Sequence, residues 1–366
     1  FRGLRRFLFE NWDTRALVSE DAFYFFAIQA AIGRLDDPFT YFLSPRDVAE
    51  MKIDRTQELG GLGMQVEKGK NGLVVIAPIE GTPAFEAGIL AGDVIVRVGD
   101  ETTRDMPLET AIGKLRGEPG TEVTFTIQRP GTPEPIVMTL TRAIFKIRSI
   151  KARMLRDGIG YIRLVSFMGE KVAEEFEAAL SGLEKDGARA LVIDLRSNPG
   201  GLMTTALAIT DLFVEDGLIF EVRARVPQLS ERHEAKREGT HPHVPIVVLV
   251  NGGSASASEI VAGILQSKGL ATVVGEKTFG KGSVQRVLPL GGAEGPAIGL
   301  TIALYYLLGE RPVHKIGIEP DIVVEVTPEQ EAALARQSIY SSGEEKIEDP
   351  RLEKAIEILK AKLEGK

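Results

Sequence analysis

The sequence contains no cysteine, and this absence removes several classes of function at once. A disulfide framework, a cysteine nucleophile and a thiolate metal site are all excluded. Histidine is scarce as well, with only His233, His241, His243 and His314. The first three lie in residues 224–243, a charged segment without apolar periodicity that we expect to be an irregular surface loop. His241 and His243 could form half of a metal site, but no partner ligands stand out, so we expect neither a metal nor an organic cofactor.

An excess of positive charge is also missing. The 366 residues carry a formal net charge of −8, which argues against nucleic acid or an anionic membrane surface as a partner. No apolar run approaches the roughly 20 residues of a membrane span. The chain begins at Phe1 with a basic, amphipathic stretch that lacks the apolar core of a signal peptide, so we expect a processed form.

The residue pattern changes along the chain and predicts four regions. Residues 1–54 look mostly helical, with apolar helical spacing over 21–35 and two prolines that then break the pattern. Residues 55–143 contain five or six short strands and two helices, enough for a small domain. In 144–330, apolar strands alternate with helices, which predicts an α/β layer with a largely parallel sheet. We expect residues 331–366 to form a helical tail. The fold class is therefore multidomain, α/β and α+β.

The turn at Ser256 has the features of a catalytic turn. An apolar strand (244–251) passes through small residues into a predicted helix at 256–269, and open α/β sheets bind ligands at such strand ends. A serine that begins a helix lies beside unpaired backbone N–H groups, of which Ala257 offers the candidate oxyanion donor. Ser256 with Glu259 also fits a purely structural capping box. Ser254 and Ser258 remain alternative nucleophiles.

Lys281 is the best candidate for the base. A lysine can accept a proton only when its pKa falls from about 10.4 to about 7–8, which burial in apolar surroundings can achieve. Lys281 is flanked by Gly280 and Gly282 and lies between two apolar strands. Gln285, four residues further on, could orient its amine. The competing interpretation is an ordinary solvated lysine.

Two glycine motifs lie near the same strand ends. In DLRSNPGG (194–201), the N–H groups of Gly200 and Gly201 could face the site, although a plain helix-entry turn braced by Asp194 and Arg196 explains the motif equally well. GEKTFGKG (275–282) approaches the phosphate-binding P-loop, which makes a nucleotide hydrolase an alternative. The hydroxyl that would bind magnesium is missing, because residue 282 is glycine. The residues that follow also alternate like a strand.

Taken together, these motifs resemble those of the carboxyl-terminal processing proteases, tail-specific serine peptidases with an inserted PDZ domain. The resemblance rests on LDDPFTYFLSP, GLGM, AGILAGDVIVRVGD, DLRSNPGG, NGGSASASEI, GEKTFGKGSVQ and KIGIEPDIVV, in that order along the chain. It implies a core like the ClpP/crotonase fold, an inserted PDZ-like β-barrel and flanking helices. It also implies that Ser256 is the nucleophile, Lys281 the base and Gln285 the residue that holds the lysine. Ala257 and either Gly200 or Gly201 would form the oxyanion hole.

The PDZ-like region predicts how a substrate would be captured. PDZ domains add a peptide to a sheet edge and hold its terminal carboxylate with loop amides. Here the loop would be Gly61, Leu62, Gly63 and Met64, and a helix at 107–115 would turn Leu108 and Ile112 toward the groove. The alternative is that these apolar residues only fill the core.

The same resemblance sets expectations about partners and location. It implies protein or peptide substrates with a free C-terminus and no nucleic acid, and it leaves open a homo-oligomer and an activating partner. It also implies an extracytoplasmic location, periplasmic or membrane-associated through a removed N-terminal segment. The alternative function is a catalytically silent PDZ scaffold that binds peptides without turnover.

Overall fold

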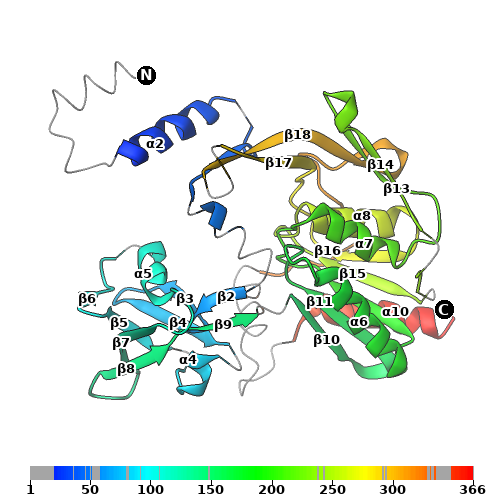
Figure 1. Ribbon diagram of the computed structural model, residues 1–366. Helices are drawn as coiled ribbons and strands as arrows, with labels where there is room; N and C mark the ends of the chain where they lie inside the picture. The colour runs from blue at the N-terminus through cyan, green and yellow to red at the C-terminus, as the bar shows by residue number, and fades with distance from the viewer. Residues whose placement is uncertain are drawn as a thin grey trace. The chain divides into compact units, whose positions relative to one another are not determined.

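The computed structural model resolves most of the chain into two compact units (Figure 1). It describes residues 20–35, 37–45, 47–49, 51, 58–79, 82–90, 92–106, 108–146, 149–236, 239–241, 244–290, 292, 295–327, 330, 334 and 348–365. The larger unit takes its described residues from Phe1–Arg55, Ile150–Val323 and Ala355–Lys366. The smaller unit takes them from Thr56–Ser149 and Val324–Lys354.

The larger unit is built on a mostly parallel sheet. Its strands, in spatial order, are β10 (Ile150–Met154), β11 (Ile159–Leu164), β12 (Ala190–Asp194), β15 (Ile246–Val250), β16 (Ala271–Gly275) and β20 (Ile322–Val323). All neighbours are parallel except β10 and β11. Every residue of β12 and β15 is buried, as continuous apolar strands are when both faces of a sheet are covered. This confirms the predicted parallel α/β layer.

Helices connect these strands and cover the sheet (Figure 1). They are α6 (Val172–Lys185), α7 (Met203–Asp211) and α8 (Ala257–Ser267). One face of α6 buries residues at helical spacing, namely Val172, Phe176, Leu180 and Leu183. Helices α7 and α8 lie between the parallel sheet and a second sheet, and one hydrophobic core joins all three layers.

The second sheet is antiparallel. Its order is β1 (Tyr41–Leu43), β18 (Ala297–Leu307), β13 (Leu218–Ala224) and β14 (Glu231–Glu234), and β17 (Ser283–Pro289) and β19 (Arg311–Pro312) also pair with β18. Two of these strands correct the sequence analysis. Strand β1 lies where only a break was expected. Strand β14, preceded by the 3-10 helix η2 (Pro227–Leu229), lies in the supposed irregular loop, where its backbone pairs with β13.

Further helices flank the larger unit's sheets. Of the helical regions expected at 1–54 and 331–366, the structure describes α2 (Glu20–Ile32) and α10 (Pro350–Leu363). Residues 1–19 and 335–347 of those regions lie outside the described residues. Two 3-10 turns are η1 (Arg156–Gly158) and η3 (Leu308–Glu310). Near the start of the chain, Ser44 and Asp47 cap each other's N–H groups, as predicted for a short helix there. Among the described residues, no helix combines the length and the apolar character that a membrane crossing requires.

The smaller unit has its own sheet and its own core. Its sheet has the order β3 (Met64–Lys68), β4 (Leu73–Pro78), β5 (Val94–Val98), β7 (Glu122–Gln128) and β8 (Ile136–Thr141), and the short β6 (Glu101–Thr102) pairs with β5. A separate ladder joins β2 (Glu58–Gly61) to β9 (Ala143–Lys146). The helices are α4 (Pro83–Glu86) and α5 (Leu108–Leu115). The sequence predicted five or six strands and two helices, and the structure has both helices and eight strands, of which β2, β6 and β9 are short additions.

Candidate active site

Ser256 stands at the junction between β15 and α8. It is the N-cap of α8 and forms the predicted capping box with Glu259, whose carboxylate accepts the Ser256 N–H at 2.8 Å. The φ angle of Ser256 is +54°, a value that few residues other than glycine adopt. Backbone strain of this kind concentrates at functional sites, where it aims a side chain. The turn is therefore a helix cap and also a strained turn of the kind that presents a nucleophile.

The Glu259 carboxylate joins the Ser256 turn to the segment that carries Lys281. Glu259 is fully buried. Besides the Ser256 N–H, its carboxylate accepts the N–H groups of Gly280 at 2.7 Å and Lys281 at 2.8 Å, and the Thr278 hydroxyl at 2.5 Å. The sequence analysis assigned Glu259 only a capping role. Its other partners lie 19 to 22 residues further along the chain, beyond the reach of a local motif.

A second tie connects the same two residues through their carbonyl groups. The hydroxyl of Tyr305, on β18, has one proton and shares it between the backbone oxygens of Ser256, at 3.1 Å, and Lys281, at 2.9 Å. Burial, reinforced by the charge of Glu259, raises the pKa of Tyr305 well above its usual value, so the hydroxyl keeps its proton. The fold thus brings together the backbones of the two residues that the sequence analysis paired. Among the hydrogen bonds of the described residues, none joins their side chains directly.

The Lys281 amine lies against an aromatic ring. Its Nζ is 5.3 Å from the ring centroid of Phe39, a residue of the N-terminal segment that the sequence analysis did not single out. Burial lowers the pKa of Lys281, the direction that a general base requires. The Phe39 ring also packs edge-on against His314 at 5.9 Å and Phe279 at 6.5 Å between centroids. The lysine is therefore half-buried, in contrast to the solvated alternative.

Gln285 lies on β17, where its side-chain nitrogen is already engaged. The Nε2 atom donates to the hydroxyl oxygens of Ser283 at 2.9 Å and Thr301 at 3.1 Å. In the described structure, no hydrogen bond joins Gln285 to Lys281. The amide oxygen is the atom of Gln285 that remains to accept from an amine.

The SNPGG turn packs directly on the Ser256 turn. A Cβ atom at Gly200, where φ is +98°, would lie 2.8 Å from the Ser256 Cβ and 2.9 Å from the Ala257 nitrogen, so only glycine fits. The Gly200 N–H donates to the Asn198 side chain at 2.9 Å. Within the described residues, no acceptor engages the N–H of Gly201, and the Ala257 N–H begins α8 without an intrahelical partner. The candidate oxyanion donors are therefore Ala257 and Gly201.

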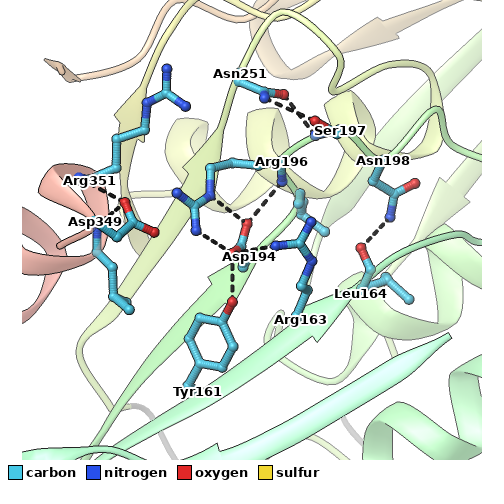
Figure 2. Close-up of polar contacts among 12 residues, drawn as sticks. Tyr161, Arg163, Leu164, Asp194, Arg196, Ser197, Asn198, Asn251, Asp349 and Arg351 are labelled. Carbon is cyan, nitrogen blue, oxygen red and sulfur yellow. Dashed lines mark hydrogen bonds and ion pairs between the residues drawn. The ribbon is translucent and has the colours of Figure 1, made fainter. Parts of the chain in front are cut away.

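A buried ionic cluster braces the start of this turn (Figure 2). Asp194, at the end of β12, accepts from Tyr161 at 2.7 Å and from two nitrogens of Arg196 at 2.6 and 2.9 Å, and Arg163 lies 3.7 Å away. Burial alone would raise the pKa of Asp194, but Arg196 and then Arg163 outweigh it and lower the pKa to about 2. The predicted bracing role of Asp194 and Arg196 is confirmed. Asn251, after β15, adds a bond of 2.7 Å from the Ser197 N–H.

In the smaller unit, the GLGM loop precedes an edge strand. Gly61 pairs with Ala143 in the β2–β9 ladder, and β3, which begins at Met64, forms one edge of the six-stranded sheet. The Gly63 carbonyl accepts the Thr82 hydroxyl at 2.9 Å. At φ +77°, a Cβ on Gly63 would lie 2.2 Å from the Thr82 Cβ. The loop is thus held in place while one edge of β3 stays unpaired within the sheet.

The apolar residues predicted to line the PDZ groove differ in burial. Leu62 is 3% exposed and belongs to the core, and Met64 and Leu108 pack against that core. Ile112 is half-buried on α5. The core interpretation therefore holds for Leu62, and Met64 and Leu108 also contribute to the core.

The structure gives little support to the two competing interpretations, the phosphate-binding P-loop and the histidine metal site. The residues after Lys281 form strand β17, whereas a P-loop opens a helix. Two of the three histidines expected in an irregular surface loop are partly buried, and His243 lies outside the described residues. His233 packs on Phe220 at 4.9 Å, and His241 bonds to Glu184 at 2.9 Å. Among the described residues, no group of three or more His, Asp or Glu residues could hold a metal ion.

Comparison with known proteins identifies both units. The model of peptidase family S41 matches residues 158–324, and a PDZ domain model matches residues 60–140. A carboxy-terminal-processing protease of Bartonella bacilliformis is 41% identical over 293 residues, which cover 79% of this chain and 67% of the relative. A carboxyl-terminal-processing protease of Synechocystis is 39% identical over 306 residues, with coverages of 82% and 70%.

Solved structures agree with this assignment. The photosystem II D1 C-terminal processing protease is 30% identical with a TM-score of 0.52, and the match covers 88% of this chain and 86% of that one. An S41 protease from Bacteroides fragilis, 16% identical, shares the fold with a TM-score of 0.60 over 94% of this chain and 91% of that one. Fold and site together define a serine peptidase that carries a PDZ domain. More particularly, the chain belongs to the family of carboxyl-terminal processing proteases.

Proposed function

We propose that the protein cleaves protein substrates near their C-terminal tails, with Ser256 as nucleophile and Lys281 as base. The observation that carries this proposal is the double tie between the two residues. Glu259 binds both of their N–H groups, and Tyr305 binds both of their carbonyls. A lowered lysine pKa and a strained serine are what this chemistry requires.

The reaction proceeds in two acyl-transfer steps. Neutral Lys281 takes the hydroxyl proton as Ser256 Oγ bonds to the scissile carbonyl carbon, and the carbonyl oxygen becomes an oxyanion. The N–H groups of Ala257 and Gly201 donate to that oxyanion. As the intermediate collapses, the C–N bond breaks and Lys281 returns its proton to the leaving amine. Water then attacks the ester with Lys281 again as base, which frees the new C-terminus and Ser256.

The PDZ unit would select the substrate. An extended tail can add to the free edge of β3, with its carboxylate on the N–H groups of Leu62, Gly63 and Met64. We further propose a β-barrel-like PDZ unit, a ClpP/crotonase-like core and an extracytoplasmic site of action. A homo-oligomer and an activating partner stay open predictions.

The test compares Ser256→Ala and Lys281→Ala with Lys277→Ala, a control lysine that is 53% exposed and paired with Glu319. With an unfolded protein as substrate, both site variants should lose cleavage by at least about 1000-fold, while the control keeps it. If both site variants cleave at the wild-type rate, the assignment is wrong.

Paired peptides with free and amidated C-termini test the PDZ role separately. Preference for the free tail supports it, and equal cleavage of both contradicts it. A silent scaffold would bind the free tail without cleaving either peptide.

A further inference from the structure

The SNPGG turn has two glycine N–H groups that could serve an oxyanion, and one of them already has a partner. The Gly200 N–H donates to the side-chain oxygen of Asn198 at 2.9 Å. The segment also forms a parallel bridge, in which the Gly200 carbonyl accepts the Phe167 N–H at 2.9 Å and the Leu202 N–H donates to the Phe167 carbonyl at 3.1 Å. Because residues 200 and 202 make both bonds of this bridge, the Gly201 N–H lies on the opposite side of the segment. Of the two amides, that of Gly201 is therefore left for a substrate.

The Asn198 side chain can adopt only one orientation at this place. Asn198 is fully buried, and its side-chain nitrogen donates to the Leu164 carbonyl at 2.7 Å, at the end of β11 (Figure 2). Turning the amide over would point its NH2 group at the Gly200 N–H and its oxygen at the Leu164 carbonyl, so that donor would face donor and acceptor would face acceptor. The amide therefore ties the turn to the parallel sheet and keeps the Gly200 N–H occupied.

The backbone of Asn198 fixes the same turn to the nucleophile segment. Its carbonyl oxygen accepts the Ala255 N–H at 3.0 Å and the Ser258 hydroxyl at 2.9 Å. These two residues flank Ser256 and Ala257, and the Ala257 N–H is the other candidate oxyanion donor. One residue thus contacts both halves of the candidate oxyanion hole, the SNPGG turn through its side chain and the start of α8 through its carbonyl.

The SNPGG turn needs such support because its backbone is strained. Ser197, next to Asn198, has a φ angle of +55°, which residues other than glycine seldom adopt. A backbone of this kind persists only where the surrounding structure holds it. Without the Asn198 side chain, the Gly200 N–H would lose its acceptor and the turn its tie to β11, so the Gly201 N–H would no longer have a fixed direction.

We propose that Asn198 is a positioning residue of the oxyanion hole, which occupies the Gly200 N–H and so aims the Gly201 N–H at the substrate's carbonyl oxygen. This inference rests on the proposed function, because it assumes that attack by Ser256 forms an oxyanion at this place. Asn198 itself touches neither the substrate nor the reacting atoms. Its loss should weaken the binding of the transition state much more than the binding of the substrate.

The test compares Asn198→Ser with Asn198→Ala in the full chain. Both variants lose the bond to Leu164, but a serine hydroxyl can still accept the Gly200 N–H two residues further on, as a weaker substitute for the amide. With a free-tailed peptide as substrate, we expect kcat to fall about 100-fold in Asn198→Ala and about tenfold in Asn198→Ser. KM should change less than twofold in both, and the two variants should have similar melting temperatures.

Inhibition by a peptide aldehyde gives a readout that a loss of stability alone would not change. Ser256 Oγ adds to the aldehyde carbon while Lys281 takes its proton, and the hemiacetal oxygen then occupies the oxyanion hole. The inhibition constant should rise by the same factor as kcat/KM falls in each Asn198 variant. The uncleaved peptide, measured with Ser256→Ala added to each variant, should bind within about twofold of its affinity for Ser256→Ala alone.

The matched control for stability is Thr210→Ala. Thr210 is buried on α7, where its hydroxyl donates to the Ala206 carbonyl at 2.7 Å. The control should lower the melting temperature and keep the wild-type kcat and inhibition constant. Ser258→Ala tests the same role if the Asn198 variants do not fold, because it removes one bond to the Asn198 carbonyl. It should lower kcat and raise the inhibition constant, each about threefold.

The positioning role is wrong if Asn198→Ser and Asn198→Ala lose kcat equally, or if kcat falls while the inhibition constant keeps its wild-type value. If neither Asn198 variant folds, a wild-type kcat and inhibition constant in Ser258→Ala contradict the role. A crystal structure of the wild-type aldehyde adduct with the hemiacetal oxygen on the Gly200 N–H also contradicts it. If Ser256→Ala cleaves at the wild-type rate, or if Ser258→Ala abolishes cleavage, the proposed function fails instead.

Discussion

The two units form their candidate sites from different chemical groups. In the peptidase unit, buried side chains hold the backbone in place: the Glu259 carboxylate and the Tyr305 hydroxyl together make six hydrogen bonds to the Ser256 and Lys281 segments. In the PDZ unit, a loop and an edge strand present backbone groups that a peptide could hydrogen-bond, and the Thr82 hydroxyl fixes the loop by donating to the Gly63 carbonyl. Single side chains should therefore matter far more in the first unit than in the second.

The largest effect should come from Glu259→Gln. The amide that replaces the carboxylate brings an N–H group toward backbone donors and leaves at least one of them without an acceptor. We expect kcat to fall about 100-fold, since misplacement by about 1 Å is enough for such a loss. Steady-state kinetics and thermal unfolding measure it. Glu319→Gln, with a side chain that is 60% exposed, serves as the control. If Glu259→Gln keeps the wild-type kcat, single buried side chains do not matter more in the peptidase unit than in the PDZ unit.

Next comes Phe39→Ala, which should act on pH dependence. The base must be neutral, so activity rises with pH through the pKa of Lys281, and burial holds that pKa below its usual value. Water admitted by the alanine should raise the pKa and move the acid limb to higher pH, with about a tenfold loss at neutral pH per unit moved. Phe39→Leu, which keeps the apolar cover, should stay near wild type. An acid limb that moves to lower pH would show that attraction between amine and ring dominates instead.

In the PDZ unit, Gly63→Ala should have a moderate effect. The new methyl group meets Thr82 and must displace the loop, so we expect KM for a free-tailed substrate to rise about tenfold with kcat little changed. Gly88→Ala has a similar φ of +72° but open space around it, and it controls for backbone strain alone. Equal effects of both changes on KM would mean that the loop does not bind the tail.

The smallest effect should come from Ile112→Ala. A half-buried side chain that borders a groove contributes a fraction of its full transfer energy, so KM for substrates with apolar tails should rise about threefold without loss of stability. Leu108→Ala, which removes a core contact, should lower the melting temperature instead. Thermal unfolding beside the kinetics separates the two, and a loss of stability in Ile112→Ala would place this residue in the core.

Local patterns predicted most of the fold. The apolar runs of β12 and β15 are typical of buried strands, and the apolar spacing of α6 is typical of a helix with one buried face. Glycine-rich turns mark where the strands end. Strand β14 was missed because its residues are charged, and their pairing with β13 depends on the exposed edge of that strand rather than on apolar periodicity.

The site was only partly predictable for a related reason. Ser256, Ala257, Lys281 and Gln285 belong to motifs that are visible in the sequence. The tertiary contacts around them are not visible in the sequence. Thr40 and Thr301, for example, lie 261 residues apart and meet only when β1 joins β18. Phe39 and Tyr305 likewise acquire their roles only from tertiary packing.

The paired ties across Ser256 and Lys281 also limit how the enzyme could be switched on and off. Moving the Ser256 and Lys281 backbones apart would break several buried hydrogen bonds at once. Each buried donor or acceptor that loses its partner costs about 1–3 kcal/mol of free energy. A regulator would meet much less resistance if it rotated the lysine and glutamine side chains. We therefore expect any control of this peptidase to act on the side-chain rotamers of Lys281 and Gln285 and not on the backbone that carries Ser256 and Lys281.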